Sequence, residues 1–218
     1  MFPGDLATKQ NASDGGPGTY TRFAGGEIWK GVTAGPYFQN GREALYKGDY
    51  DKAIAEMTQA IRALPNFAFL YSYRGSVYHE KGDYDKAIAD FSEAIRISPN
   101  YIDAYLDRAY VYLDKDDYDK AIADANQAIR INPNYSSLYD ARGSAYYYNG
   151  DYDKAIADFN EAIRLYFDYY VVYCRRGYAY MMKGNFTQAR ADANKALQLN
   201  PNFQKAKDLD AELKKKGY

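Results

Sequence analysis

A ten-residue segment recurs along this chain at a fixed interval. It begins at Gly82 and again at Gly150, and in both places it reads GDYDKAIADF. Related segments begin at Gly48, Asp116 and Gly184, so that all five starts lie 34 residues apart. A constant period of this length indicates one supersecondary unit copied in tandem, with each copy burying its apolar face against the next. The sequence therefore predicts an elongated repeat array rather than a domain built around one central core.

Residues 68–101 contain a complete copy of the repeat. Apolar and small side chains recur in it at spacings of three, four and seven, which is the period of two amphipathic helices. Between them, Gly82 can adopt the left-handed conformation that ends the first helix, and the Asp83 carboxylate can cap the second. Pro99 then ends the second helix. Each copy is therefore expected to fold as an antiparallel helical hairpin.

The order of large and small residues in this copy resembles the tetratricopeptide repeat family. In that family, aromatic and small residues alternate before a proline. The corresponding residues in this copy are Tyr71, Gly75, Tyr78, Ala87, Phe91, Ala94 and Pro99. The resemblance implies an all-α fold, a right-handed superhelical solenoid of five hairpins whose first helices line a concave groove. The five repeats would occupy residues 34–67, 68–101, 102–135, 136–169 and 170–203.

The two ends of the chain differ from the repeats and from each other. Residues 204–218 are expected to form a C-terminal capping helix, because their apolar residues follow a helical spacing among charged ones. Those residues are Ala206, Leu209 and Leu213. Residues 1–33 are rich in glycine and lack any period, so they are expected to be an arm without regular structure. Phe23 and Trp29 are its candidate assembly contacts.

Charge and composition exclude several classes of function. The 28 basic and 29 acidic side chains give a formal net charge of −1, so the chain lacks the positive field that nucleic acids attract. The chain has one histidine and one cysteine, and no metal-binding, phosphate-binding or nucleophile motif. We therefore expect no catalysis, no cofactor, no metal and no nucleic-acid partner.

Targeting signals are also lacking in the sequence. No apolar run approaches the roughly 18 residues of a membrane span, and the start of the chain lacks the basic and apolar segments of a secretory signal. No membrane insertion is expected. These features and the single cysteine favour the cytoplasm, with the periplasm as the alternative.

One position departs from the family pattern in four of the copies. Where the family most often has leucine, this chain has arginine, and sixteen residues later it has aspartate. The pairs are Arg74 and Asp90, Arg108 and Asp124, Arg142 and Asp158, and Arg176 and Asp192. A guanidinium near a packed interface needs a partner, so each arginine is predicted to bind its aspartate across the hairpin. The alternative is a row of free arginines that binds acidic ligands.

Candidate partner-binding residues follow from the positions that the family exposes to its groove. They are Phe38, Arg42, Phe69, Tyr73, Tyr110, Tyr147, Tyr148, Tyr178 and Arg175. Aromatic side chains offer large contact areas at low entropic cost and are enriched at recognition hot spots. The alternative is that some of them pack sideways between neighbouring helices.

The family's best-known ligand site, a clamp for the terminal carboxylate of heat-shock chaperones, is absent. Its positions hold Phe38, Arg42, Tyr73, Asp103 and Asp107, and two aspartates would repel a carboxylate. Binding of chaperone tails is therefore not expected, although Arg175 could hold an acidic side chain.

The junction after the fourth repeat lacks the Pro-Asn pair that follows the other second helices, so the helix there need not stop on schedule. It is unusually aromatic, and its candidate assembly contacts are Tyr166, Phe167 and Tyr170. Apolar patches of this kind mark contact sites.

Two functions fit these features. The first is a non-enzymatic scaffold that binds a peptide or protein segment in an aromatic groove. The second is a structural subunit of a homo-oligomer or larger complex, assembled through the N-terminal arm and the solenoid ends.

Overall fold

The computed structural model describes residues 34–166 and 168–218. These residues form helices and the turns between them, with no strand among them, which confirms the all-α class. The chain divides into two compact units, Met1–Pro99 and Asn100–Tyr218, and each is described by itself. The predicted arm, with Phe23 and Trp29, lies outside the described residues, as does Phe167.

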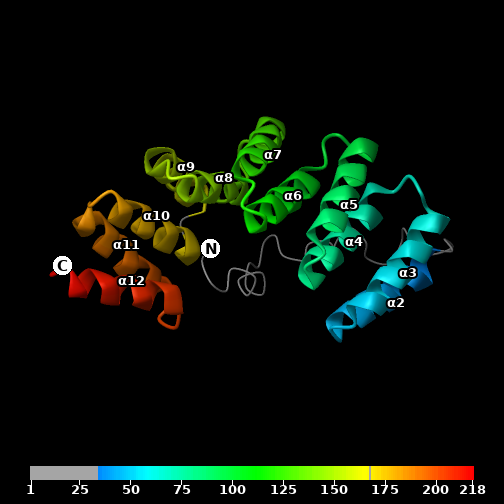
Figure 1. Ribbon diagram of the computed structural model, residues 1–218, viewed down its shortest axis with the longest axis horizontal. Helices are drawn as coiled ribbons and strands as arrows, with labels where there is room; N and C mark the ends of the chain where they lie inside the picture. Colours follow the sequence, from blue (N-terminus) through cyan, green and yellow to red (C-terminus); the bar gives the residue numbers. More distant parts are fainter. Residues whose placement is uncertain (1–33, 167) are drawn as a thin grey trace. The chain divides into compact units, whose positions relative to one another are not determined.

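The described part of unit 1 consists of two helical hairpins (Figure 1). Helix α2 (Ala34–Tyr46) pairs with α3 (Tyr50–Ala63), and α4 (Ala68–Lys81) pairs with α5 (Tyr84–Ile97). Helix α4 also packs on α3, so that the second hairpin stacks on the first.

Unit 2 contains three hairpins and a final single helix. The hairpins are α6 (Ile102–Asp114) with α7 (Tyr118–Ile131), α8 (Ser136–Tyr148) with α9 (Tyr152–Leu165), and α10 (Tyr170–Met182) with α11 (Phe186–Leu199). The single helix is α12 (Gln204–Lys215). Helix α6 contacts α8, α8 contacts α10, and α10 contacts α12. These four helices therefore form one continuous layer, which we call the first-helix layer.

The turn inside each hairpin depends on one residue in the left-handed conformation. Gly82 has this role after α4, with a φ of +84°, as the sequence predicts. In the turn between α6 and α7 the equivalent residue is Asp116, with a φ of +58°. A residue with a side chain is strained in this region, although aspartate tolerates it better than most. The period of the array is kept at the cost of local strain.

The aspartate that follows this turn residue caps the second helix in three hairpins. The carboxylates of Asp49, Asp117 and Asp151 each accept a hydrogen bond from the backbone N–H three residues later. Asp83 precedes α5 in the same way, but its carboxylate makes no capping hydrogen bond and pairs with Lys86 instead. Asp83 therefore occupies the N-cap position of α5, but the prediction that its carboxylate caps this helix is wrong.

Small residues set the distance between the two helices of a hairpin. A Cβ atom added to Gly143 would lie 2.8 Å from Cε1 of Phe159, which is fully buried. In the hairpin of α6 and α7 the equivalent pair is Ala109 and Ala125, both fully buried. A larger residue on the first helix thus accompanies a smaller one on the second, which conserves packed volume.

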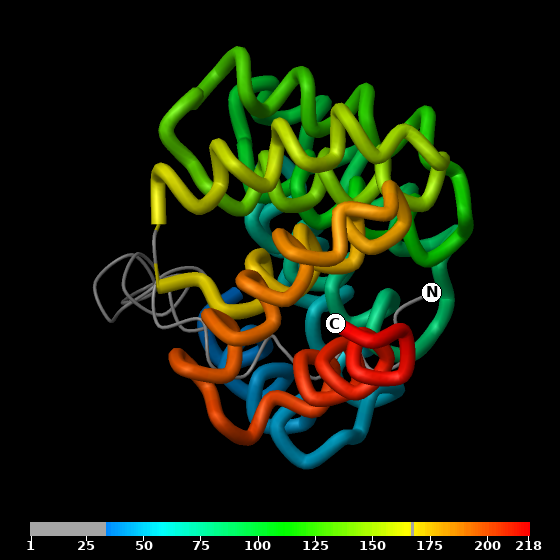
Figure 2. Tube along the Cα trace, turned by 90° about the vertical axis from the view of Figure 1, so that its left-hand side faces the viewer, coloured from blue at the N-terminus to red at the C-terminus, as the bar shows by residue number. Residues whose placement is uncertain are grey.

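Helix α12 closes unit 2. It lies against α10 and α11 at the C-terminal end of the chain, drawn in red beside orange helices in Figure 2. Its buried residues are Ala206, Leu209 and Leu213. The remaining positions are largely polar, which is the composition expected of a capping helix and was predicted from the sequence.

Candidate protein-binding surface

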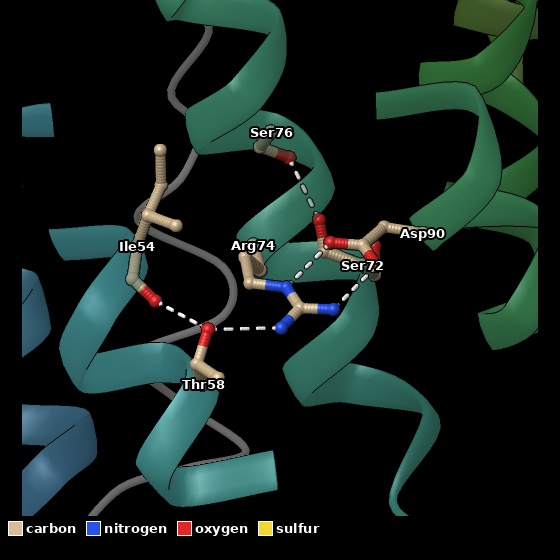
Figure 3. Close-up of polar contacts among 6 residues, drawn as sticks. All are labelled: Ile54, Thr58, Ser72, Arg74, Ser76 and Asp90. Carbon is tan, nitrogen blue, oxygen red and sulfur yellow. Dashed lines mark hydrogen bonds and ion pairs between the residues drawn. The ribbon is translucent and has the colours of Figure 1, made fainter. Parts of the chain in front are cut away.

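The arginines that replace leucine in the repeat are bound across the hairpins. In every case Nε and Nη2 of the arginine donate to the two carboxylate oxygens of the predicted aspartate, at 2.6–2.8 Å. Figure 3 shows Arg74, from α4, in this arrangement with Asp90 from α5. The predicted pairing is confirmed, and these arginines do not form a free row for acidic ligands.

Each of three arginines also holds the preceding hairpin. Nη1 of Arg74 donates to Oγ1 of Thr58 on α3 at 2.9 Å, as Figure 3 shows. Nη1 of Arg142 and of Arg176 donates to Asn126 and Asn160 at 2.6 Å. This contact was not predicted from the sequence, although its signal is a polar residue sixteen positions before the arginine. One guanidinium thus fixes both the hairpin and its neighbour.

Two opposing effects act on the pKa of the Asp90 carboxyl, and burial is the larger one, so the pKa is raised. Burial raises the pKa of the Asp90 carboxyl, while the Arg74 guanidinium lowers it. The Asp90 carboxylate is buried, and the bidentate hydrogen bonds that it accepts from Arg74 favour its charged form against this burial. These pairs link the two helices of each hairpin, and Arg74, Arg142 and Arg176 also bind a residue of the preceding hairpin.

In unit 1 the candidate aromatic residues form one cluster between α2 and α4. Phe38 is only 1 % exposed and lies in the core, with its ring centroid 5.4 Å from that of Phe69 and 5.2 Å from that of Tyr73. Phe38 therefore offers no contact surface, which corrects the sequence-based assignment. Phe69 and Tyr73 are half-buried, as is Arg42, whose guanidinium lies 5.8 Å from the Phe38 ring centroid.

In unit 2 the candidate tyrosines are half-buried and differ in their contacts. Tyr110 and Tyr147 lie on neighbouring helices of the first-helix layer, and burial raises the pKa of both, to about 12 for Tyr147. The Tyr178 hydroxyl donates to the backbone carbonyl of Lys205 on α12 at 3.2 Å. Tyr148 stacks on Tyr118, at the start of α7, with ring centroids 5.9 Å apart. Tyr148 thus packs sideways, as the alternative interpretation held.

Arg175 is not available to an acidic ligand. It is buried, and its Nη1 binds Oδ2 of Asp140, which is fully buried on α8. The Tyr169 hydroxyl donates to the same carboxylate oxygen at 3.2 Å. The expectation that Arg175 could hold an acidic side chain of a partner is therefore corrected. One sequence signal could have indicated this contact. Of the five residues at this position of the repeat, Asp140 is the only charged one.

Two acids on α6 lie close together near these tyrosines. Burial, with a contribution from Asp107, raises the pKa of the Asp103 carboxyl to about 6. Burial and the charges of Asp103 and Asp107 in turn raise the pKa of Tyr135 to about 12. Asp103 and Asp107 thus lie within electrostatic reach of Tyr135, the residue that precedes α8.

Among the described residues of the junction between α9 and α10, Tyr166 is an exposed aromatic residue. Helix α9 ends at Leu165, the equivalent of Ile131 in α7, so the missing Pro-Asn pair does not extend the helix. Tyr166 is 41 % exposed, with its ring centroid 6.0 Å from that of Tyr169. Tyr170 packs edge-on against Phe203, with centroids 5.0 Å apart.

Metal-binding clusters and membrane-spanning helices are both lacking among the described residues. Among the described residues, no group of three or more His, Cys, Asp or Glu side chains is arranged to hold a metal ion. None of the helices in this part of the chain is long and apolar enough to cross a membrane.

Comparison with solved structures gave many similar helical-repeat proteins. The structure of MamA is 27 % identical, with a TM-score of 0.67, over 78 % of this chain and 92 % of that one. TTC0263 of Thermus thermophilus, a TPR protein, is 21 % identical with a TM-score of 0.68, over 83 % of this chain and 98 % of its own. YrrB is 21 % identical with a TM-score of 0.63, over 79 % and 89 %.

Comparison with sequence families gave a consistent result. Tetratricopeptide repeat models match residues 34–67, 102–135 and 170–203, and a TPR repeat model matches residues 75–116 and 143–184. No curated protein sequence matches the chain. The family models and the helical hairpins together show that this chain belongs to the tetratricopeptide repeat family.

Proposed function

We propose that this protein is a non-enzymatic scaffold that binds a segment of a partner protein on its first helices. The observation that carries the proposal is the set of half-buried tyrosines on the first-helix layer of unit 2, Tyr110, Tyr147 and Tyr178. Partly exposed tyrosines on packed helices combine a rigid apolar ring with a polar hydroxyl, which suits them to protein recognition. Half-buried Phe69 and Tyr73 offer a similar surface in unit 1.

Two further observations support this proposal. YrrB, one of the similar structures, is described as a TPR protein with an unusual peptide-binding site. The arginines of the repeat are bound within the chain, so contact with a partner falls to the tyrosines and their neighbouring acids.

A peptide-selection experiment tests this function. Random peptides of about twelve residues, displayed on phage, would be selected on the full chain, and the affinity of the enriched peptides measured by calorimetry. Tyr147→Ala is expected to weaken binding by about tenfold or more, which is the effect of removing a recognition hot spot. Tyr84→Ala is the matched control, because Tyr84 is a half-buried tyrosine at the start of the second helix α5. Failure to enrich any peptide, or equal losses for the two variants, would argue against the proposal.

Self-assembly is a second candidate function, favoured by the exposed ring of Tyr166 at the junction of α9 and α10. Under this reading Tyr166→Ser lowers the molar mass measured by light scattering over a range of concentrations. An unchanged mass would remove the junction from consideration.

A further inference from the structure

Four aromatic residues of unit 1 lie together where the first helices α2 and α4 meet. Phe38 of α2 is the buried centre, with its ring centroid 5.4 Å from that of Phe69 and 5.2 Å from that of Tyr73, both on α4. Phe67 directly precedes α4, and its ring centroid lies 5.9 Å from that of Phe69. We call these four residues the unit 1 aromatic cluster. Phe67, Phe69 and Tyr73 are half-buried, so part of each side chain can contact a further group.

A cation borders the unit 1 aromatic cluster. Arg42 is half-buried, and the central carbon of its guanidinium lies 5.8 Å from the Phe38 ring centroid. Its Nη1 donates to the Gln39 side chain at 3.4 Å, and among the described residues it forms no ion pair with a carboxylate. A guanidinium attracts the face of an aromatic ring, and the indole of tryptophan attracts it most strongly. The cluster and its cation therefore suit a tryptophan side chain.

The chain itself supplies a tryptophan close to this surface in sequence. Trp29 is the only tryptophan of the chain and lies five residues before Ala34, where α2 begins. Five residues of extended chain span at most about 18 Å, and Phe38 lies four residues, or roughly 6 Å, along α2. Trp29 is thus within reach of the cluster. A group tethered this closely has an effective concentration on the order of millimolar, against which a separate partner must compete.

We propose that the N-terminal arm, residues 1–33, binds the unit 1 aromatic cluster of its own chain through Trp29. The indole packs against the half-buried rings of Phe69 and Tyr73 and lies beside the Arg42 guanidinium. The arm then covers this part of the first helices α2 and α4, and a partner segment must displace it to bind there. This inference concerns a contact within one chain and does not depend on the proposed scaffold function.

Tryptophan fluorescence of the full chain tests this contact, because Trp29 is the only residue that reports. The acrylamide quenching constant should be about threefold or more below that of free N-acetyltryptophanamide, since a bound indole is closed to the quencher for most of the time. Phe69→Ala should raise the constant by about twofold or more, because the indole loses a ring that it contacts. An indole as accessible in the unaltered chain as in the free amide would overturn the inference.

The matched control is Tyr84→Ala. This substitution also removes a half-buried aromatic side chain, at the start of the second helix α5, and it should leave the quenching constant unchanged. Circular dichroism confirms that each variant keeps its helices. An equal rise in the quenching constant for Phe69→Ala and Tyr84→Ala would refute the contact between Trp29 and the cluster.

A second measurement needs no substitution. In the isotope-labelled full chain, nuclear Overhauser effects are expected between the indole protons of Trp29 and the ring protons of Phe69 or Tyr73. A shielded indole without these effects would lie elsewhere, and the inference would fail.

Dilution separates binding within one chain from binding to a second copy. The quenching constant should not depend on protein concentration, because the arm and the cluster belong to the same molecule. A constant that rises on dilution would show that Trp29 binds another copy and would overturn the inference. None of these measurements involves a selected peptide, so the scaffold function stands or fails separately.

Discussion

Replacing Asp103 by asparagine tests how burial of this carboxyl affects the stability of unit 2. The carboxyl has a pKa of about 6 in the folded chain, against an ordinary value of 3.8, mainly because it is buried. Between these two values the folded state binds more protons than the unfolded state, so its stability falls as the pH rises from about 4 to about 6. Above about pH 6 the loss is complete.

The magnitude follows from this pKa shift. A shift of about two pKa units corresponds to about 3 kcal/mol. Asp103 is partly solvated, so we discount the penalty to about 1–2 kcal/mol. Asp103→Asn removes the charge and should therefore stabilise unit 2 by that amount at pH 7.5 and by almost nothing at pH 4.

Urea unfolding followed by circular dichroism at the two pH values measures both free energies. Asp119→Asn is the control, since Asp119 is an exposed acid on α7, and it should change stability by less than about 0.5 kcal/mol. Equal effects of Asp103→Asn at pH 4 and pH 7.5, or a loss of stability at pH 7.5, would refute the reasoning.

Three further substitutions test the packing of the repeats. Arg142→Ala leaves the Asp158 carboxylate buried without its cation and should lower the free energy of unfolding, measured in urea, by about 3–5 kcal/mol. If the double variant Arg142→Leu/Asp158→Leu loses as much stability, the unpaired carboxylate is not the cause of the loss. Asp116→Gly should raise stability by about 0.5–1 kcal/mol in thermal unfolding, because it relieves the left-handed strain; a lower melting temperature would contradict this. Gly143→Ala brings a Cβ to 2.8 Å from Phe159 and should lower the free energy of unfolding by about 1–3 kcal/mol. If the two residues are coupled, Phe159→Ala should cost less stability in the Gly143→Ala variant than in the unaltered chain.

Much of the fold could be predicted because one sequence pattern recurs in five copies. The helical period, the turn glycines and the Arg–Asp pairs depend on contacts inside one hairpin, so each copy repeats the same evidence. The pair of Arg142 and Asp158 is an example, because its spacing of sixteen residues is shared by three other copies.

The rest depends on contacts that no repeat shares. Arg175 and Asp140 meet across neighbouring hairpins and occur once, so the repeat pattern gave no partner for either residue. Phe38 is buried because Phe69 and Tyr73 of the next first helix cover it, which a count of groove positions cannot show. Helix α9 ends at Leu165 without a proline, since packing of the hairpin determines its length as strongly as the local stop signal does.

The most direct test of the proposed function is to map where a bound peptide lies. Amide chemical shifts of the isotope-labelled full chain would be recorded with and without a peptide selected on it. We expect the shifts to change along α6, α8, α10 and α12, around Tyr110, Tyr147 and Tyr178. Changes confined to the second helices α7, α9 and α11 would contradict it.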